Sequence, residues 1–246
     1  MFKKIILFWS FFLISLTAEA FKVSPIELNF SNKGKSVVQT ILVENTTDAK
    51  VPVEIFAYDR IHIAGKEKRV RTRDFYYFPK QFILKPGEKR NIRVSWMGIR
   101  SKQAPKDKKL AMKKGKTSIA QEKAYRLEIK QVPVNLKKNK AKKTGIKFLY
   151  NYVASLYVTP PSAKPNFKVL SYRRISPTRV ELAVQNVGGA HDIMAQYNLQ
   201  TQGDNAMVID MVKQEDDVRG INLLAGEKRK VVFKVPASIG RGNLTF

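Results

Sequence analysis

The side chains that most often catalyse reactions or bind metals are scarce in this sequence of 246 residues. It contains no cysteine and only two histidines, His62 and His191, which lie 129 positions apart. The lack of Cys excludes disulfides, thiolate nucleophiles and cysteine-based metal centres. Neither a G-x-S-x-G motif nor a phosphate-binding glycine loop is present, and the acidic run 215–217 is typical of a loop. We therefore predict a protein that is not an enzyme and has no catalytic residues, no metal site and no cofactor, with both histidines on the surface.

The segments after residue 20 have the two-residue periodicity of β-strands. Ile26, Leu28 and Phe30 alternate with polar residues, and short β-branched runs follow them along the chain. Turn sequences separate these runs, and Lys-Pro-Gly-Glu at 85–88 fits a type II turn with Pro second and Gly third. Many short strands at this spacing predict an all-β fold, either a sandwich or a barrel.

The first twenty residues have the three parts of a secretory signal peptide. Lys3 and Lys4 precede an apolar run over 5–16, and an Ala-Glu-Ala cleavage site follows at 18–20. The apolar run is shorter than the roughly 20 residues that a membrane span needs. A short membrane anchor is the alternative. We predict that residues 1–20 are cleaved and that the rest of the chain is exported.

A repeated pattern divides the exported part of the chain. The sequence over 84–92 recurs in similar form over 223–231, and that over 41–45 recurs over 182–186. The offsets of 139 and 141 are nearly equal, which indicates two copies of one β-sandwich plan. Three prolines within 159–165 lie between the copies and would stiffen the link. We predict an N-terminal domain over 21–158 and a C-terminal domain over 159–246.

Motifs in both copies resemble the PapD-like family of periplasmic pilus chaperones. The N-terminal copy carries Glu122-x-x-Tyr125-Arg126-Leu127 and then a Val-Pro pair, close to a motif of that family. The other matching segments are 43–45, 76–79, 82–87, 92–94, 184–191 and 223–226. The resemblance implies two immunoglobulin-like β-sandwich domains in tandem after a cleaved signal peptide, in a protein of the periplasm.

The resemblance also implies how such a protein works. These chaperones bind pilus or surface-fibre subunits whose own immunoglobulin-like fold lacks a strand, donate a β-strand to them, and deliver them to an outer-membrane usher. An incomplete sandwich exposes a groove and unpaired strand edges, which a donated strand fills and pairs. The expected partners are therefore a subunit that lacks a β-strand and an usher.

In this chain the donor strand corresponds to residues 145–158. Ile146, Phe148, Tyr150 and Tyr152 share one face of it, and we predict that this face binds the subunit. The opposite face also carries bulky residues at 149 and 153, so the alternative is that the first face is ordinary core and the second meets the subunit. The N-terminal strand, with Ile26, Leu28 and Phe30, is expected to flank the same groove.

One feature of the best-known family members is missing. They hold the C-terminal carboxylate of the subunit with an Arg on the first strand and a Lys on the last strand of the first domain. Glu27 and Ser155 stand at these positions here, and neither supplies a cation. Either Lys147, Lys22 or Arg126 substitutes as the carboxylate anchor, or, as we favour, the chain belongs to a divergent branch that holds its clients differently.

The chain is strongly basic, with 46 Lys and Arg against 20 Asp and Glu and a formal net charge of +26. Basic residues concentrate in 60–73, 100–123 and 137–147. We expect these segments to be solvated, with weak contact to an anionic membrane surface as the functional alternative. Nucleic acid is not an expected partner, because the chain is exported and lacks recognition motifs. The alternative function is a structural or adhesive exported protein that binds anionic surfaces through these basic loops.

Overall fold

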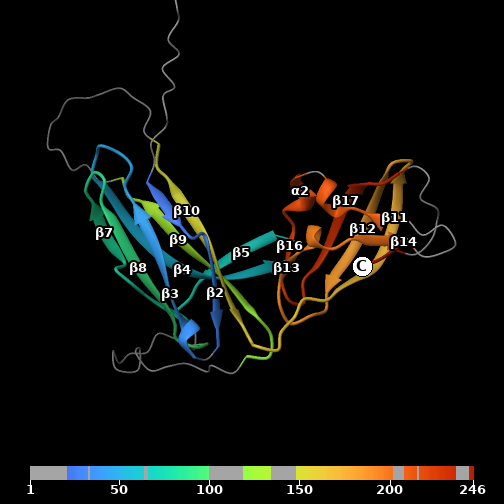
Figure 1. Ribbon diagram of the computed structural model, residues 1–246, viewed down its shortest axis with the longest axis horizontal. Helices are drawn as coiled ribbons and strands as arrows, with labels where there is room; N and C mark the ends of the chain where they lie inside the picture. Colours follow the sequence, from blue (N-terminus) through green and yellow to red (C-terminus); the bar gives the residue numbers. More distant parts are fainter. Residues whose placement is uncertain are drawn as a thin grey trace, which may run out of the picture.

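The computed structural model describes residues 21–32, 34–63, 66–99, 119–133, 148–201, 208–214, 216–236 and 244–246. These residues form two lobes that consist mainly of β-strands (Figure 1). The predicted signal peptide lies outside the described residues, as do the basic stretches 100–118 and 134–147. No helix in the described part of the chain is long and apolar enough to cross a membrane.

The first lobe contains strands β1 to β10. Their bounds are β1 (Lys22–Ser24), β2 (Glu27–Ser31), β3 (Val38–Glu44), β4 (Val51–Ile63), β5 (Lys66–Arg71), β6 (Phe75–Phe78), β7 (Gln81–Leu84), β8 (Lys89–Trp96), β9 (Lys123–Gln131) and β10 (Asn151–Thr159), with a 3-10 turn over Lys35–Val37 before β3.

These strands form two sheets that enclose one core. The first sheet has the order β1-β3-β8-β6, and the second has the order β2-β10-β9-β4-β5, with β7 beside β4. The N-terminal segment changes sheets at Pro25, which has no N–H for either ladder. Alternate residues of each strand point inward, so Leu28 and Phe30 are buried while Glu27 and Asn29 are exposed. Long β-branched and aromatic side chains therefore fill the space between the sheets.

The second lobe contains the remaining elements. Their bounds are β11 (Phe167–Ser176), β12 (Arg179–Asn186), β13 (Asp192–Ile193), β14 (Leu199–Thr201), β15 (Val208–Ile209), α2 (Asp216–Arg219), β16 (Asn222–Leu223), β17 (Lys228–Lys234) and β18 (Leu244–Thr245), with 3-10 turns over Met194–Gln196 and Met211–Lys213. The sheet β11-β12-β17 packs its inner face against a second, separate core that includes Leu182, Leu199 and Phe233.

The two lobes repeat one set of turn contacts. Asn45 is buried, and its side-chain amide donates to the carbonyls of Ala49 and Lys85 at 2.7 and 2.9 Å. Asn186, at the equivalent position, is also buried and donates to Ala190 and Leu223 at 2.7 and 3.1 Å. A glycine at positive φ follows in each copy and donates its backbone N–H to the carbonyl of that Asn.

The expected all-β fold of two tandem sandwiches is confirmed. The first core ends with Val158 and the second begins with Phe167. A division into domains over 21–158 and 159–246 remains our proposal for where the boundary falls within the intervening residues.

Candidate functional site

β10 has a free edge over its first residues, and another strand could pair there. β2 runs parallel to β10 and pairs with it only from Ser155 to Thr159. β9 covers the other edge over residues 151–158, so β10 lies between β9 and β2 (Figure 1). Within the ranges that the structure describes, no strand pairs with the β2 side of residues 151–154. Exposed edges of this kind can pair with a strand of another chain.

The hydrogen bonds show which backbone groups face the free edge. The N–H of Gln131 donates to the carbonyl of Tyr150 at 2.9 Å, so the even-numbered residues are directed toward β9. The N–H of Ser155 donates to the carbonyl of Ile26 at 2.8 Å on the opposite side. The alternation therefore directs the N–H and C=O groups of Asn151 and Val153 toward the free edge.

The face that we predicted to bind a subunit continues a core face. Downstream, Ala154, Leu156 and Val158 have the same parity and are buried. Upstream, Tyr150 and Tyr152 are half-buried against the first core, and the Phe148 side chain is 72% exposed. Along this face, the burial of the side chains thus decreases toward the N-terminal end of the strand.

The other predicted subunit contacts lie in different environments. Tyr152 is tied to its own domain, because its hydroxyl donates to the Phe21 carbonyl at 2.6 Å and the two rings meet edge to face. Leu28 and Phe30 belong to the first core, whereas Ile26 is 61% exposed. Ile146 and Lys147 lie outside the described residues.

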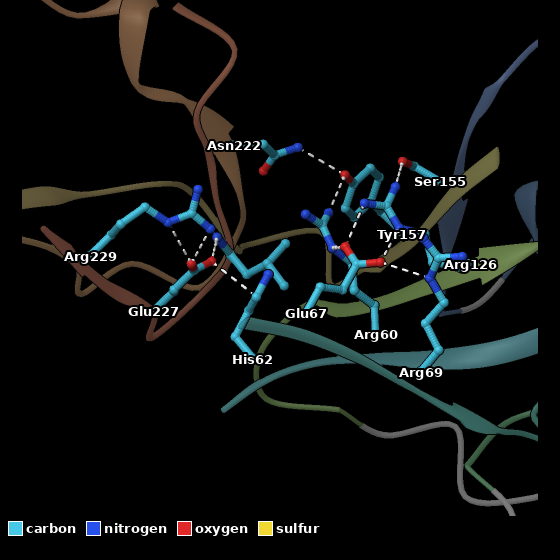
Figure 2. Close-up of polar contacts among 11 residues, drawn as sticks. Arg60, His62, Glu67, Arg69, Arg126, Ser155, Tyr157, Asn222, Glu227 and Arg229 are labelled. Atoms are coloured by element: carbon cyan, nitrogen blue, oxygen red, sulfur yellow. Dashed lines mark hydrogen bonds and ion pairs between the residues drawn. The ribbon is translucent and has the colours of Figure 1, made fainter. Parts of the chain in front are cut away.

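A cluster of three arginines surrounds one carboxylate beside β10. Glu67 on β5 forms an ion pair with Arg60 Nε on β4 at 2.8 Å, and accepts a hydrogen bond from Arg69 Nε at 2.9 Å. Arg126 on β9 binds it with two donors, Nη2 at 2.7 Å and Nε at 3.2 Å. Figure 2 shows these guanidinium groups converging on Glu67 from three strands. We call Arg60, Glu67, Arg69 and Arg126 the arginine cluster.

The arginine cluster adjoins the two positions where the family resemblance would place its cations. Ser155 is opposite Glu27 in the register of β10 and β2, and Arg126 Nη1 donates to the Ser155 hydroxyl (Figure 2). Of the candidate anchors, only Arg126 is placed here. Lys22 is exposed on β1 in the other sheet, where it pairs in register with Glu44.

The electrostatics of the cluster favour a further anion. Burial alone would raise the pKa of Glu67, but hydrogen bonds from Arg126 and Arg69 and the charges of Arg126 and Arg60 lower it from 4.5 to about 2. One carboxylate therefore faces three guanidinium groups. The neighbouring carboxylates bond elsewhere, Glu27 to Asn29 and Glu128 to Tyr58 and Asn151.

No motif in the sequence predicts this cluster directly. Residues 60–63 and 66–71 of the basic run lie in β4 and β5, and most of them are exposed, but Arg60 and Arg69 also bind Glu67. A third basic residue of the run, Arg71, lies over the Phe56 ring at 3.5 Å from its centroid. The alternation of Glu67 with Arg69 on one strand was the only available signal.

Both histidines lie at the junction of the two lobes, each beside a glutamate of the opposite lobe. His191 Nδ1 is 2.6 Å from Glu122 Oε1, and the His191 ring stacks on Tyr157 with 3.5 Å between centroids. His62 Nδ1 is 3.4 Å from Glu227 Oε2 (Figure 2), and burial lowers the pKa of His62 against the raising effect of Glu227. The histidines are thus half-buried at an interface rather than free on the surface.

Tyr157 connects this junction to the arginine cluster. Its hydroxyl accepts hydrogen bonds from Arg60 Nη1 at 3.2 Å and from the Asn222 amide of the second lobe at 2.8 Å (Figure 2). Tyr157 lies on β10, so one side chain of this strand contacts both the arginine cluster and the second lobe. Within the described ranges, no three metal-ligating side chains come together.

We expect Glu122→Ala to loosen the junction of the lobes. The Glu122 carboxylate accepts from the His191 backbone N–H at 3.0 Å and from the Thr159 hydroxyl at 2.7 Å, besides its contact with the His191 ring. Loss of a buried acceptor with several partners costs about 1–3 kcal/mol. Calorimetry of Glu122→Ala should show two separated unfolding transitions. The control Glu44→Ala, which removes an exposed ion pair, should have the same melting profile as the parent protein. An unchanged profile for Glu122→Ala would contradict this role.

The comparisons with known proteins identify the fold. No protein-family model and no curated protein matches the chain. A structure of a chaperone–tip adhesin complex of CFA/I fimbriae matches with a TM-score of 0.55 and 15% identity over 93% of this chain and 98% of that one. The class 5 fimbriae chaperone CfaA also has a TM-score of 0.55, with 13% identity over 92% of this chain and 99% of that one.

A third match is the CsuC-CsuE chaperone–tip adhesion subunit complex of archaic Csu pili from Acinetobacter baumannii. Its TM-score is 0.51, with 15% identity over 86% of this chain and 89% of that one. At such identities the likeness establishes the fold, which is the two-domain immunoglobulin-like fold of fimbrial chaperones. The resemblance to PapD-like chaperones is thereby confirmed at the level of the fold.

Proposed function

We propose that this protein is a periplasmic chaperone that stabilises pilus or surface-fibre subunits by donating a β-strand. The observation that carries the proposal is the free edge of β10, which continues upstream into an exposed Phe148, in a fold shared with fimbrial chaperones. An unpaired edge supplies main-chain hydrogen bonds, and alternate apolar side chains fill a groove. The predicted signal peptide supports a periplasmic location, and an outer-membrane usher is the expected recipient of the subunit.

In this proposal the subunit pairs with residues upstream of Ser155. Phe148 enters the groove of the subunit, together with Ile146 on the same face by the two-residue period. Tyr150 and Tyr152 form the transition from the groove to the chaperone core, since they are half-buried against that core. Ile26 flanks the groove, whereas Leu28 and Phe30 support it from within the core.

The proposed carboxylate anchor is Arg126, assisted by Arg60. Both side chains are largely buried and belong to a cluster whose positive charge exceeds its negative charge, so a second carboxylate would be stabilised there. The site adjoins Ser155, which the resemblance aligns with a cationic anchor position. An anchor supplied from a neighbouring strand is one way in which a divergent branch of the family could hold its clients differently.

Arg126→Ala is expected to weaken capture of a subunit by about 1.5–3 kcal/mol, the usual contribution of a charge-assisted hydrogen bond. Calorimetric titration of a purified subunit would measure the change, with Lys22→Ala as the matched control because Lys22 is exposed in the other sheet. Arg126→Lys should recover only part of the affinity, since Lys cannot form two parallel hydrogen bonds. The effect of Arg126→Ala is also measured with a subunit that lacks its C-terminal residue. If the substitution weakened the capture of that subunit by the same amount, Arg126 would not be the anchor.

The chaperone function itself is tested by co-expression with small secreted β-rich subunits of the same organism. A strand-donating chaperone should form equimolar complexes that persist in about 0.5 M salt, because apolar groove filling dominates the binding. An adhesive protein that binds anionic surfaces through its basic loops would release its ligand as salt screens the charges. Complexes that dissociate with salt, or no complex with any such subunit, would reject strand donation.

A further inference from the structure

A second candidate binding surface lies on the first lobe, in the sheet that does not contain β10. A cleft of about 610 Å³ follows the edge strand β6, and residues of β6, its flanking turns and β8 line it. Two aromatic side chains at this cleft are open to solvent, with Phe78 63% and Tyr76 45% exposed. Large apolar side chains grouped at one cleft are typical of a binding surface rather than of ordinary solvent-exposed sheet.

The cleft is also lined by cations that have no counter-ion. Arg73, Lys80 and Arg93 are exposed, and none of the three forms an ion pair within the part of the chain that the structure describes. Among the described residues that line the cleft, none carries a carboxylate. The nearby Asp74 is buried and accepts a hydrogen bond from the Tyr125 hydroxyl at 2.8 Å. The cleft therefore presents positive charge that a negatively charged ligand could neutralise.

Backbone groups of β6 are available at the same place. β6 pairs with β8 and, among the described residues, with no other strand. The N–H of Met97 donates to the carbonyl of Asp74 at 2.7 Å, so the even-numbered residues of this segment are directed toward β8. The alternation leaves the N–H and C=O groups of Phe75 and Tyr77 on the open side. Such groups pair with an extended peptide and have no equivalent partner in a sugar, a lipid or a simple anion.

We infer that this cleft binds an extended, acidic peptide segment of a partner protein, which adds to β6 as a further strand. Phe78 pairs with Arg93 across the ladder and Tyr76 with Ser95, so rings and a cation lie on one face. On an added strand, the side chains that point to this face could include apolar groups over the rings and carboxylates near Arg93, with Arg73 and Lys80 at the two ends of the cleft. Lys80 lies seven positions after Arg73, a span of at most about 25 Å, which suits a short segment.

This surface is separate from the proposed donor strand β10, which belongs to the other sheet. A chaperone with both surfaces could hold its subunit through β10 and still be recognised by another protein through β6. The inference does not depend on the proposed chaperone function, because it concerns a cleft, charges and an edge that are present in the free protein.

The test uses the full exported chain and a fluorescent eight-residue peptide in which every second position is valine or aspartate in turn and threonine fills the others, so that valine and aspartate lie on one face of a strand. Fluorescence anisotropy is the readout. We expect saturable binding, and at least about tenfold weaker binding in Arg93→Glu because attraction becomes repulsion. Phe78→Ser should weaken binding as well, and Lys22→Glu, at the opposite edge of the same sheet, is the matched control. All four proteins are compared by circular dichroism, since the substituted side chains are exposed.

Two altered probes test the mode of binding. The same peptide with lysine in place of aspartate should not bind, and one that is N-methylated along one edge should lose binding because it cannot pair with Phe75 and Tyr77. The inference would be overturned if the lysine peptide bound equally well or if the N-methylated peptide still bound. It would also be overturned if Lys22→Glu weakened binding as much as Arg93→Glu, or if no saturable binding were seen up to about 1 mM peptide. Subunit capture through β10 should be unchanged in Arg93→Glu, so failure here is distinguishable from failure of the chaperone function.

Discussion

Phe148→Glu is expected to abolish subunit capture while the chaperone stays folded. The Phe148 side chain is 72% exposed in the free protein, so a charge is tolerated there. In a complex the same side chain would enter an apolar groove, where an unpaired carboxylate is strongly disfavoured. We expect affinity to fall by more than about 3 kcal/mol, or at least about a hundredfold, as measured by co-purification and calorimetric titration with a co-expressed subunit.

Two further variants distinguish this result from general damage. Tyr152→Glu should destabilise the first domain itself, because the Tyr152 side chain is packed against Phe21 and bonded to its carbonyl. Val212→Glu, at an exposed apolar side chain of the second lobe, should change neither stability nor capture. If Phe148→Glu still captured subunits and Leu149→Glu did not, the opposite face of the strand would be the one that meets the subunit.

Glu67→Gln should cause the largest loss of stability among single surface substitutions. Among the described residues, Glu67 is the carboxylate that forms ion pairs with Arg60, Arg69 and Arg126, so the substitution deprives two largely buried guanidinium groups of that ionic partner. The Glu67 side chain is 21% exposed, so solvent screens part of the interaction. We expect the free energy of unfolding to fall by about 2 kcal/mol, as measured by urea denaturation at pH 7.

Glu67→Gln should also remove part of the decrease in the free energy of unfolding at acid pH. The folded-state pKa of Glu67 is lowered from 4.5 to about 2, so the folded protein binds fewer protons there than the unfolded chain. Its contribution to stability is therefore complete above about pH 4.5 and is lost as the pH falls toward 2. The stability difference between the parent and Glu67→Gln should narrow over this range. Glu44→Gln, at an exposed ion pair, is the control, and a constant difference across the range would contradict the assignment.

The strands and their inward faces could be predicted from the sequence. The alternation of Ile26, Leu28 and Phe30 with polar residues is a local property, because successive side chains of a strand point to opposite faces. The repeat with offsets of 139 and 141 also required no structure, and both copies form the same hydrogen bonds around Asn45 and Asn186. Short-range chemistry is sufficient for such features, since turn and strand geometry depends on neighbouring residues.

Which of these side chains are available to a partner could not be read from the same alternation. Ile26 and Leu28 have the same parity, yet one is largely exposed and the other buried. The difference arises because the chain changes sheets at Pro25, so Ile26 lies just outside the ladder that begins at Glu27. Likewise, Phe148 and Tyr152 share a face, but only Tyr152 reaches the side chain of Phe21.

The arginine cluster and the histidine contacts were decided by tertiary structure alone. Arg60, Glu67 and Arg126 come from three strands, and Glu122 and Glu227 reach His191 and His62 across the junction of the lobes. The ionic partner of a charged residue cannot be identified from the sequence around it, because an ion pair depends on distance in space. Residues separated by 59 positions, such as Glu67 and Arg126, become neighbours only when the order of strands in the sheet is set. That order is selected by burial of the whole core, which combines residues from distant parts of the sequence and which no local pattern contains.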